Sequence, residues 1–298
     1  MEEDAQPLPQ CPRCGPKGHV VNYGKRKAKN RTAQRYKCMS CDRTFSTEPI
    51  KRAVYNSTAI LAAVTYYNLG HTLEETACEI NRRFKVRPSE PTIASWSKRL
   101  ARTCSFAKLR KRYKIDPERL LVAKPCKNGK SFVRHELKLN IAGKAFPGIK
   151  DFIKGADATI EPTAIPVSCA GRKTTRRWRN VATTMAFMAL ITARTRQERL
   201  EEIQRFFLAN DASTFAANVP ITLSPQESTD LQAPFAGHMD LLQLRNGKIY
   251  ILDYREGPLE QAAPLLELYR QALSKRAGIP MNAIATASFN QDGYLEFD

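Results

Sequence analysis

Apolar and polar positions between residues 57 and 112 repeat with the period of an α-helix and predict three helices. The first helix can be capped by Ser57 or Thr58. The second helix opens with Thr72 and Glu75, which have the spacing of a capping box. This part of the chain is therefore expected to be entirely α-helical.

The third predicted helix begins at Pro91 or Thr92 and separates apolar from polar side chains. Its apolar face is formed by Ile93, Trp96 and Leu100. Its outward face carries Thr92, Ser95, Lys98, Arg99 and Arg102. Such a face either lies in a DNA major groove or forms the solvated side of a plain three-helix bundle. These five outward residues are candidate nucleic-acid contacts.

From about residue 131 the pattern becomes mixed. Residues 132–141 alternate weakly, as in a strand, and a helical stripe covers about residues 181–208. Three strands, a helix and a last strand follow, near residues 215–223, 235–244, 248–255, 258–277 and 283–289. The resulting order, αβββαβ, predicts an α/β domain.

The turn between the second and third of these strands contains Asn246-Gly247, the pair that favours a two-residue hairpin. The numbers of facing residues must then sum to 493. The predicted pairs are Leu244 with Ile249, Leu242 with Ile251, Asp240 with Asp253, and His238 with Arg255. Alternation places all of these side chains on one face of the sheet.

Asp240 and Asp253 form the candidate catalytic site. Opposed β-carbons lie about 5 Å apart, so the two carboxylates repel unless something neutralises them. Mg²⁺ or Mn²⁺ does so with carboxylate and water ligands. A shared proton, or a register slip that separates the two side chains, would also remove the conflict.

Length and composition indicate a soluble protein of several domains. The 298 residues are 42% hydrophobic and 26% charged, and no apolar run reaches the roughly 18 residues of a membrane span. The first residues are acidic, unlike a secretory signal, so we expect a cytoplasmic protein without a membrane partner. We place the domains at 1–50, 51–115 and 116–298, the last with a core at about 181–298.

Basic residues are concentrated in the first part of the chain. Residues 1–130 carry 28 Lys and Arg against 11 Asp and Glu, whereas residues 131–298 carry 20 against 18. A concentrated positive charge suits a polyanion, because binding releases the counterions of the phosphates. DNA is the expected partner of this part of the chain, and RNA is the alternative. The sequence does not indicate the oligomeric state.

Four of the eight cysteines, Cys11, Cys14, Cys38 and Cys41, form two C-x2-C pairs. Two such turns together form the tetrahedral sulfur cage of a structural Zn²⁺, with short strands near residues 20–23 and 34–37 between them. Four unpaired buried cysteines, or a redox pair, are the alternatives. The segment is too short to bury a core, so zinc would supply its folding energy.

Basic side chains surround the two cysteine pairs: Lys25, Arg26, Lys27, Lys29, Arg31, Arg35, Lys37 and Arg43. They form either a solvated loop or a phosphate-contacting surface. We take Lys25, Arg26, Lys27 and Arg35 as the candidate contacts.

The cysteine motif, the basic segment and Thr44-Phe45-Ser46 together resemble the N-terminal zinc ribbon of insertion-sequence transposases over about residues 10–47. The third predicted helix resembles the recognition helix of the helix-turn-helix modules that follow such ribbons. The resemblance implies a DNA-binding N-terminal part.

Gly237-His238-Met239-Asp240, Asp253-Tyr254-Arg255 and the helix containing Tyr269 resemble the PD-(D/E)XK nuclease superfamily over about residues 181–298, in particular its RecB-like and CRISPR-associated nucleases. The resemblance implies that Asp240 and Asp253 hold Mg²⁺ or Mn²⁺, which activates water for phosphodiester hydrolysis. It also makes His238, Gln261 and Tyr269 possible active-site residues.

The chain departs from this family at three places. The lysine of the motif is replaced by Arg255, which can stabilise phosphate charge but cannot act as a base. Leu265 stands where a glutamine is expected, and no cysteine follows Cys169 to hold the iron–sulfur cluster of some members. A glutamate of the upstream helix, Glu198, Glu201 or Glu202, could join the metal ligands.

Three hypotheses follow. The first is a metal-dependent nuclease targeted to DNA by the ribbon and the helix-turn-helix, with Asp240, Asp253 and Arg255 as catalytic residues. The second is a DNA-binding regulator or assembly factor with an inactive nuclease fold, which the replacement by Arg255 favours. The third is a transposase, which only the ribbon favours, because no spaced Asp/Asp/Glu triad on an RNase H-like sheet is evident.

Overall fold

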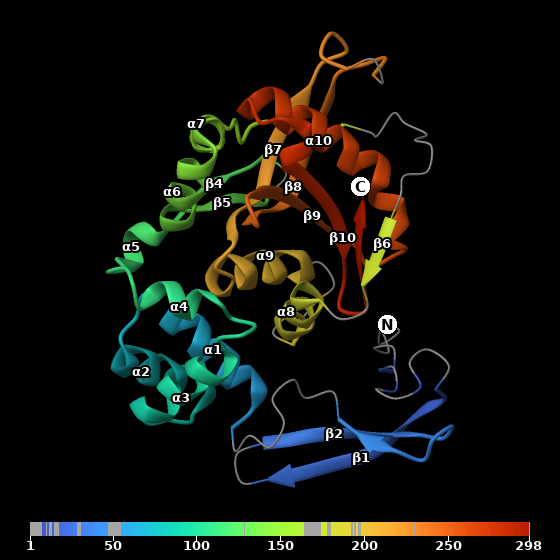
Figure 1. Ribbon diagram of the computed structural model, residues 1–298. Coiled ribbons are helices and arrows are strands. Elements are labelled where there is room, and N and C mark those ends of the chain that lie inside the picture. Colours follow the sequence, from blue (N-terminus) through green and yellow to red (C-terminus); the bar gives the residue numbers. More distant parts are fainter. Residues whose placement is uncertain are drawn as a thin grey trace.

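The protein has mixed α/β structure, with a small sheet near the cysteines and a larger mixed sheet (Figure 1). The computed structural model describes residues 8–9, 11, 14, 18–28, 31–46, 55–127, 129–163, 174–177, 180–191, 193, 195, 198–228 and 231–297. Of residues 27–28, 31–33 and 176–177 only the backbone is described. Lys29 and the expected boundary near residue 50 lie outside the described residues.

The small sheet is antiparallel and has the order β1-β2-β3. Its strands are β1 (Val20–Ala28), β2 (Arg31–Cys38) and β3 (Thr44–Phe45). The two strands expected from the sequence are present but longer, so the basic segment between them belongs to a β-hairpin. The hairpin is interrupted by a bulge, because Asn22 pairs with Tyr36 but Lys25 pairs with Gln34.

A group of four helices follows: α1 (Ser57–Asn68), α2 (Leu73–Phe84), α3 (Glu90–Leu100) and α4 (Phe106–Arg110). The capping box of Thr72 and Glu75 is confirmed, and so is the buried face of α3. Two helix starts differ slightly from expectation. Asn56 caps α1 by accepting a 2.9 Å hydrogen bond from the Thr58 amide, and α3 begins already at Glu90.

The helices α1–α3 share a hydrophobic core with α8 (Val181–Leu190) and α9 (Glu198–Asn210). A buried polar chain crosses the same contact between α1 and α9. Asn68 donates to the amide oxygen of Asn210, and Asn210 donates to the Thr65 hydroxyl, each at 2.9 Å. Through this contact the helical group packs directly against the α/β part.

A second buried polar cluster lies at the same junction, around Asp211. Its carboxylate accepts hydrogen bonds from Ser105, Thr214 and Gln243. Lys138 donates to the backbone carbonyls of Leu208 and Asp211. Burial lowers the pKa of Lys138 to about 7. These bonds satisfy polar groups that would otherwise be costly to bury.

The larger sheet has the strand order β4-β5-β7-β8-β9-β10-β11-β6 among the described residues. Its strands are β4 (Leu121–Pro125), β5 (Ser131–His135), β6 (Thr174–Arg177), β7 (Thr214–Leu223), β8 (Phe235–Arg245), β9 (Lys248–Tyr254), β10 (Ile284–Phe289) and β11 (Tyr294–Phe297). Only β9 and β10 pair in parallel in these described strands, and α10 (Ala263–Ala277) connects them.

Helices cover both faces of this sheet (Figure 1). On one face α10, α6 (Glu136–Ala145) and α7 (Pro147–Gly155) close a core that includes Leu242, Ile249 and Ile251. On the other face α8 and α9 pack over Leu241 and Leu252. The remaining elements are α5 (Pro117–Leu120) and the 3-10 helices η1 (Leu259–Ala262) and η2 (Met281–Ala283).

The order of α9, β7, β8, β9, α10 and β10 matches the αβββαβ order expected from the sequence. Two expectations were wrong. The strand expected over residues 132–141 ends at His135, where α6 begins because the His135 side chain caps it. The helix expected over residues 181–208 is two helices, since the Thr195 hydroxyl accepts from the Glu198 amide and begins α9.

Candidate functional site

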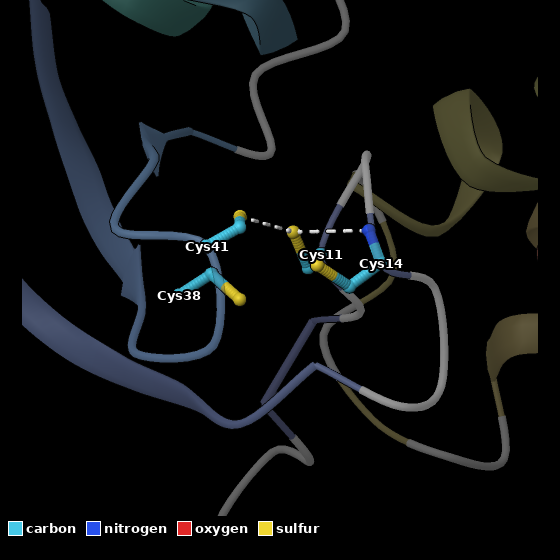
Figure 2. A group of neighbouring side chains, drawn as sticks. All are labelled: Cys11, Cys14, Cys38 and Cys41. Carbon is cyan, nitrogen blue, oxygen red and sulfur yellow. Dashed lines mark hydrogen bonds between the residues drawn. The ribbon is translucent and has the colours of Figure 1, made fainter.

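The four cysteines of the two C-x2-C pairs come together beside the small sheet (Figure 2). Their Sγ atoms lie within 4.8 Å of one another, and those of Cys11 and Cys41 are 3.7 Å apart. Tetrahedral zinc with Zn–S bonds of about 2.3 Å places its sulfurs about 3.8 Å apart. The cluster therefore fits a structural metal such as zinc.

The backbone holds the cysteine cluster from several directions. The Cys38 amide donates to the Arg43 carbonyl at 2.9 Å, and the Met39 amide donates to the His19 carbonyl at 2.8 Å. Gly18 lies directly against the cluster. A β-carbon at this position would be 2.7 Å from the Cys11 β-carbon and 3.2 Å from the Cys38 sulfur. Only glycine permits this close approach.

The neighbouring thiols also affect the acidity of Cys14. A hydrogen bond with the Cys41 thiol, reinforced by burial, raises the pKa of Cys14 to about 12. Zinc binds thiolates, so metal binding at this cluster would release protons. All described cysteines are free, which excludes a disulfide among these four.

The candidate nucleic-acid contacts fall on two surfaces. On the hairpin, Lys25 and Arg26 are exposed, Arg35 is half-buried, and only the backbone of Lys27 is described. On α3, Ser95, Lys98 and Arg99 are exposed, and Arg102 is exposed just beyond the helix. Thr92 is half-buried and shares a 2.8 Å hydrogen bond with the Ser89 hydroxyl.

The hairpin of β8 and β9 has the register expected from its turn. Asn246 and Gly247 adopt φ angles of 48° and 71°, as a type I′ turn requires. The paired residues run from Arg245 with Lys248 to Leu241 with Leu252, and each pair sums to 493. The local turn thus sets the pairing along five positions of the hairpin.

Beyond Leu241 and Leu252 the two strands separate. β8 stays paired with β7 as far as Phe235, whereas β9 stays paired with β10 as far as Tyr254. We call the point of separation the fork. Asp240 and Asp253 are the first residues of each strand beyond the last pair, so both acids lie at the fork.

The fork corrects part of the expected register. The ladder does not reach Asp240 and Asp253, or His238 and Arg255. Instead, the Asp240 carboxylate accepts a 2.9 Å hydrogen bond from the Tyr254 amide, which a continued ladder would have used. His238 pairs with Pro220 of β7, and neither of its buried ring nitrogens has a hydrogen-bond partner among the described residues.

The carboxyl groups of both acids have raised pKa values. Burial, followed by the charge of Asp253, raises the pKa of Asp240 from 3.8 to about 8. Burial also raises the pKa of Asp253, and Arg255 opposes this shift. The Arg255 guanidinium donates from Nε to the Asp253 carboxylate at 2.9 Å. One carboxylate therefore has a resident counterion, while the other favours its protonated form.

Three neighbours complete the fork. The Tyr269 hydroxyl donates to the His238 carbonyl at 2.9 Å, and its ring fills the space where a Gly237 β-carbon would lie. Gln204 of α9 donates to the Asp240 carbonyl at 3.3 Å. Burial, followed by the charge of Lys130 in the loop before β5, lowers the pKa of His238, and the same charge opposes the raised pKa of Asp240.

Other expected members of the site lie elsewhere. Gln261 is exposed in η1. Within the described ranges, the four cysteines are the only group of three or more metal-binding side chains close enough to share an ion. Glu198, Glu201 and Glu202 therefore do not join the acid pair. Sequence reasoning missed Lys130 and Gln204, because neither belongs to a local motif with the acids.

The donor set at the fork nevertheless suits a hard divalent cation. Two carboxylates with water ligands are a common arrangement for Mg²⁺, and Mn²⁺ shares the preference for oxygen. A cation there would replace the proton favoured by Asp240 and compete with Arg255 for Asp253.

Comparisons with protein-family models, curated proteins and solved structures found no match to this chain. In the part of the chain that the structure describes, no helix combines the length and apolar character needed to cross a membrane.

Proposed function

We propose that this chain binds nucleic acid through its basic N-terminal part and hydrolyses phosphodiester bonds at the fork. The convergence of Asp240 and Asp253 carries the hydrolytic part of the proposal, because two neighbouring carboxylates repel unless a cation or a proton neutralises them. The charge excess of residues 1–130 and the exposed basic face of α3 support nucleic acid as the substrate.

In this proposal Asp240 and Asp253 hold Mg²⁺ or Mn²⁺. The ion, when bound, supplies an activated water and stabilises charge on the phosphate. Arg255, which donates to Asp253, would then be free to contact the phosphate. Tyr269 is a positioning residue, since its hydrogen bond to the His238 carbonyl holds β8 where it leaves β9.

A second candidate function is nucleic-acid binding without hydrolysis, as a regulator or assembly factor. It is favoured by the contacts that both acids make within the protein. Arg255 neutralises Asp253, and the Tyr254 amide occupies an oxygen of Asp240. Arginine at position 255 also provides no general base.

DNA cleavage separates the two functions. Wild-type protein would be incubated with linear, supercoiled and single-stranded DNA, and with RNA, in Mg²⁺ or Mn²⁺. Asp240→Asn keeps an oxygen that accepts from the Tyr254 amide but removes the charge, so it should abolish cutting and leave binding intact. Asp151→Asn, at an exposed position on α7, is the matched control and should cut as wild type does.

Binding without cutting by the wild type in either metal would support the second function. Arg255→Lys then tests the cause, because cleavage gained by this variant would locate the defect at the replaced lysine. The absence of any nucleic-acid binding would contradict both functions.

A further inference from the structure

The bulge in the small sheet presents an aromatic side chain that the zinc cluster does not use. Between the pairs Asn22–Tyr36 and Lys25–Gln34, two residues of β1, Tyr23 and Gly24, oppose the single residue Arg35. Gly24 has a φ of +74°, which allows the extra residue to be accommodated. A bulge of this kind changes the direction of the side chains beside it.

Tyr23 differs from the other aromatic residues of this sheet. The rings of Tyr36 and Phe45 lie 5.8 Å apart and pack against the cluster of Cys11, Val20 and Cys38. Tyr23 is 49% exposed and lies outside that cluster. Packing of the metal site therefore does not account for an aromatic residue at position 23.

Two cations lie over the exposed ring. The Arg35 guanidinium carbon lies 5.2 Å from the ring centroid, and the Lys37 ammonium lies 5.8 Å from it. Both side chains are held in place, Arg35 by the Thr44 hydroxyl at 3.2 Å and Lys37 by Asp42 at 2.6 Å. An exposed aromatic ring can stack on a nucleobase, and cations held beside it can contact the phosphates that flank the base.

We propose that Tyr23 is a stacking platform for an unpaired nucleobase, with Arg35 and Lys37 contacting the adjacent phosphates. The ligand class is single-stranded nucleic acid, because bases stacked within a duplex do not expose their faces to a side chain. This inference rests on the proposed nucleic-acid binding of the N-terminal part, but it does not depend on hydrolysis at the fork.

The test is a double-mutant cycle between the protein and the base. Binding of labelled oligo(dT), and of the same strand with abasic sites, would be measured by fluorescence anisotropy. For Tyr23→Ala we expect about 5- to 100-fold weaker binding of oligo(dT), the range of one lost stacking contact. Wild type should bind the abasic strand more weakly than oligo(dT) by a similar factor. Tyr23→Ala should bind the two strands with equal affinity.

Tyr23→Phe keeps the ring and should bind as wild type does. Tyr113→Ala removes a tyrosine of similar exposure, 44%, away from the small sheet and should have no comparable effect. Zinc content, measured for every variant, shows that the metal site is retained.

Unchanged binding of oligo(dT) by zinc-loaded Tyr23→Ala would overturn the inference. An equal loss of affinity of Tyr23→Ala for the abasic strand would also overturn it, because the ring would then contribute to binding in the absence of a base. Failure of the wild type to bind any nucleic acid would instead contradict the proposed function, so the two failures are distinguishable.

Discussion

The two sheets of this protein are built mainly from antiparallel pairings but are stabilised differently. The small sheet encloses a buried cluster of only Cys11, Val20 and Cys38 among its described residues. The large sheet has helices on both faces and an extensive apolar core on each. We expect the first to depend on a metal for its folding, whereas the second gains its stability from burial of apolar surface.

The polar sites of the two sheets differ in the same way. The four thiols beside the small sheet lie within 4.8 Å of one another and fit a cation directly. At the fork of the large sheet, Arg255 already neutralises Asp253. Metal removal should therefore unfold the first region and leave the second folded.

Loss of a zinc ligand is expected to have the largest effect. Cys38→Ser should remove the zinc and expose the amides of β1 and β2 to hydrogen exchange, because structural zinc contributes about 10–16 kcal/mol in zinc-finger peptides. The main thermal transition of the large sheet should stay unchanged. Zinc analysis and hydrogen exchange measure the two effects.

Cys78→Ser is the matched control, since Cys78 is an exposed free cysteine in α2. Unchanged zinc content in Cys38→Ser, or a loss in both variants, would contradict the assignment of the metal site.

Truncation of the large core comes next. Phe289 is fully buried, with its ring 5.4 Å from that of Phe207 and 5.8 Å from that of Tyr254. Phe289→Ala should lower the free energy of unfolding by about 3–5 kcal/mol while zinc stays bound. Urea unfolding measures this loss, and Phe289→Leu should show a clearly smaller one. A change below about 1 kcal/mol would show that this core is not tightly packed.

The contact between α1 and α9 should have an intermediate effect. Asn210→Ala leaves the buried amide of Asn68 without its acceptor and should cost about 1–3 kcal/mol. The double variant Asn68→Ala/Asn210→Ala should lose less free energy of unfolding than the sum of the two single losses, because the partners share one hydrogen bond. Additive losses in urea unfolding would show that the two side chains act independently.

The smallest effect is expected at a surface ion pair. The Arg276 guanidinium donates from Nη2 to the Glu227 carboxylate at 2.8 Å. This contact holds the pKa of Glu227 down to about 2. The pKa is lowered in the folded state, so the stabilisation is present above about pH 4.5 and is lost as pH falls toward 2. Glu227→Gln should cost at most about 1 kcal/mol at pH 7, because solvent screens the pair.

Urea unfolding at several pH values checks this dependence. The difference between wild type and Glu227→Gln should shrink below pH 4.5, and a difference that grows there would contradict the assigned sign.

Local signals were sufficient where neighbours in the sequence decide the structure. The Asn246-Gly247 turn, the capping box at Thr72 and the two cysteine pairs each predicted the observed arrangement. The break before α9 was missed because a capping hydroxyl at Thr195 interrupts an otherwise continuous apolar stripe.

The fork could not be predicted from the hairpin alone. Its position depends on β7 and β10, which draw β8 and β9 apart, and on the Asp240 carboxylate that accepts from the Tyr254 amide. Lys130 was missed for a similar reason. β5 joins the sheet beside β7 through Val133 and Ala217, and no local pattern reports a pairing so distant in sequence.

The central claim, a divalent cation at the fork, is tested most directly by titrating Mn²⁺ into zinc-loaded protein in a calorimeter, using buffers of different ionisation enthalpy. Wild type should bind Mn²⁺ and release a proton at pH 7, because the pKa of Asp240 is raised to about 8 and the acid must ionise to bind the ion. Asp240→Asn should lose this binding and its proton release. Equal Mn²⁺ binding by both proteins, or none by the wild type, would contradict the account.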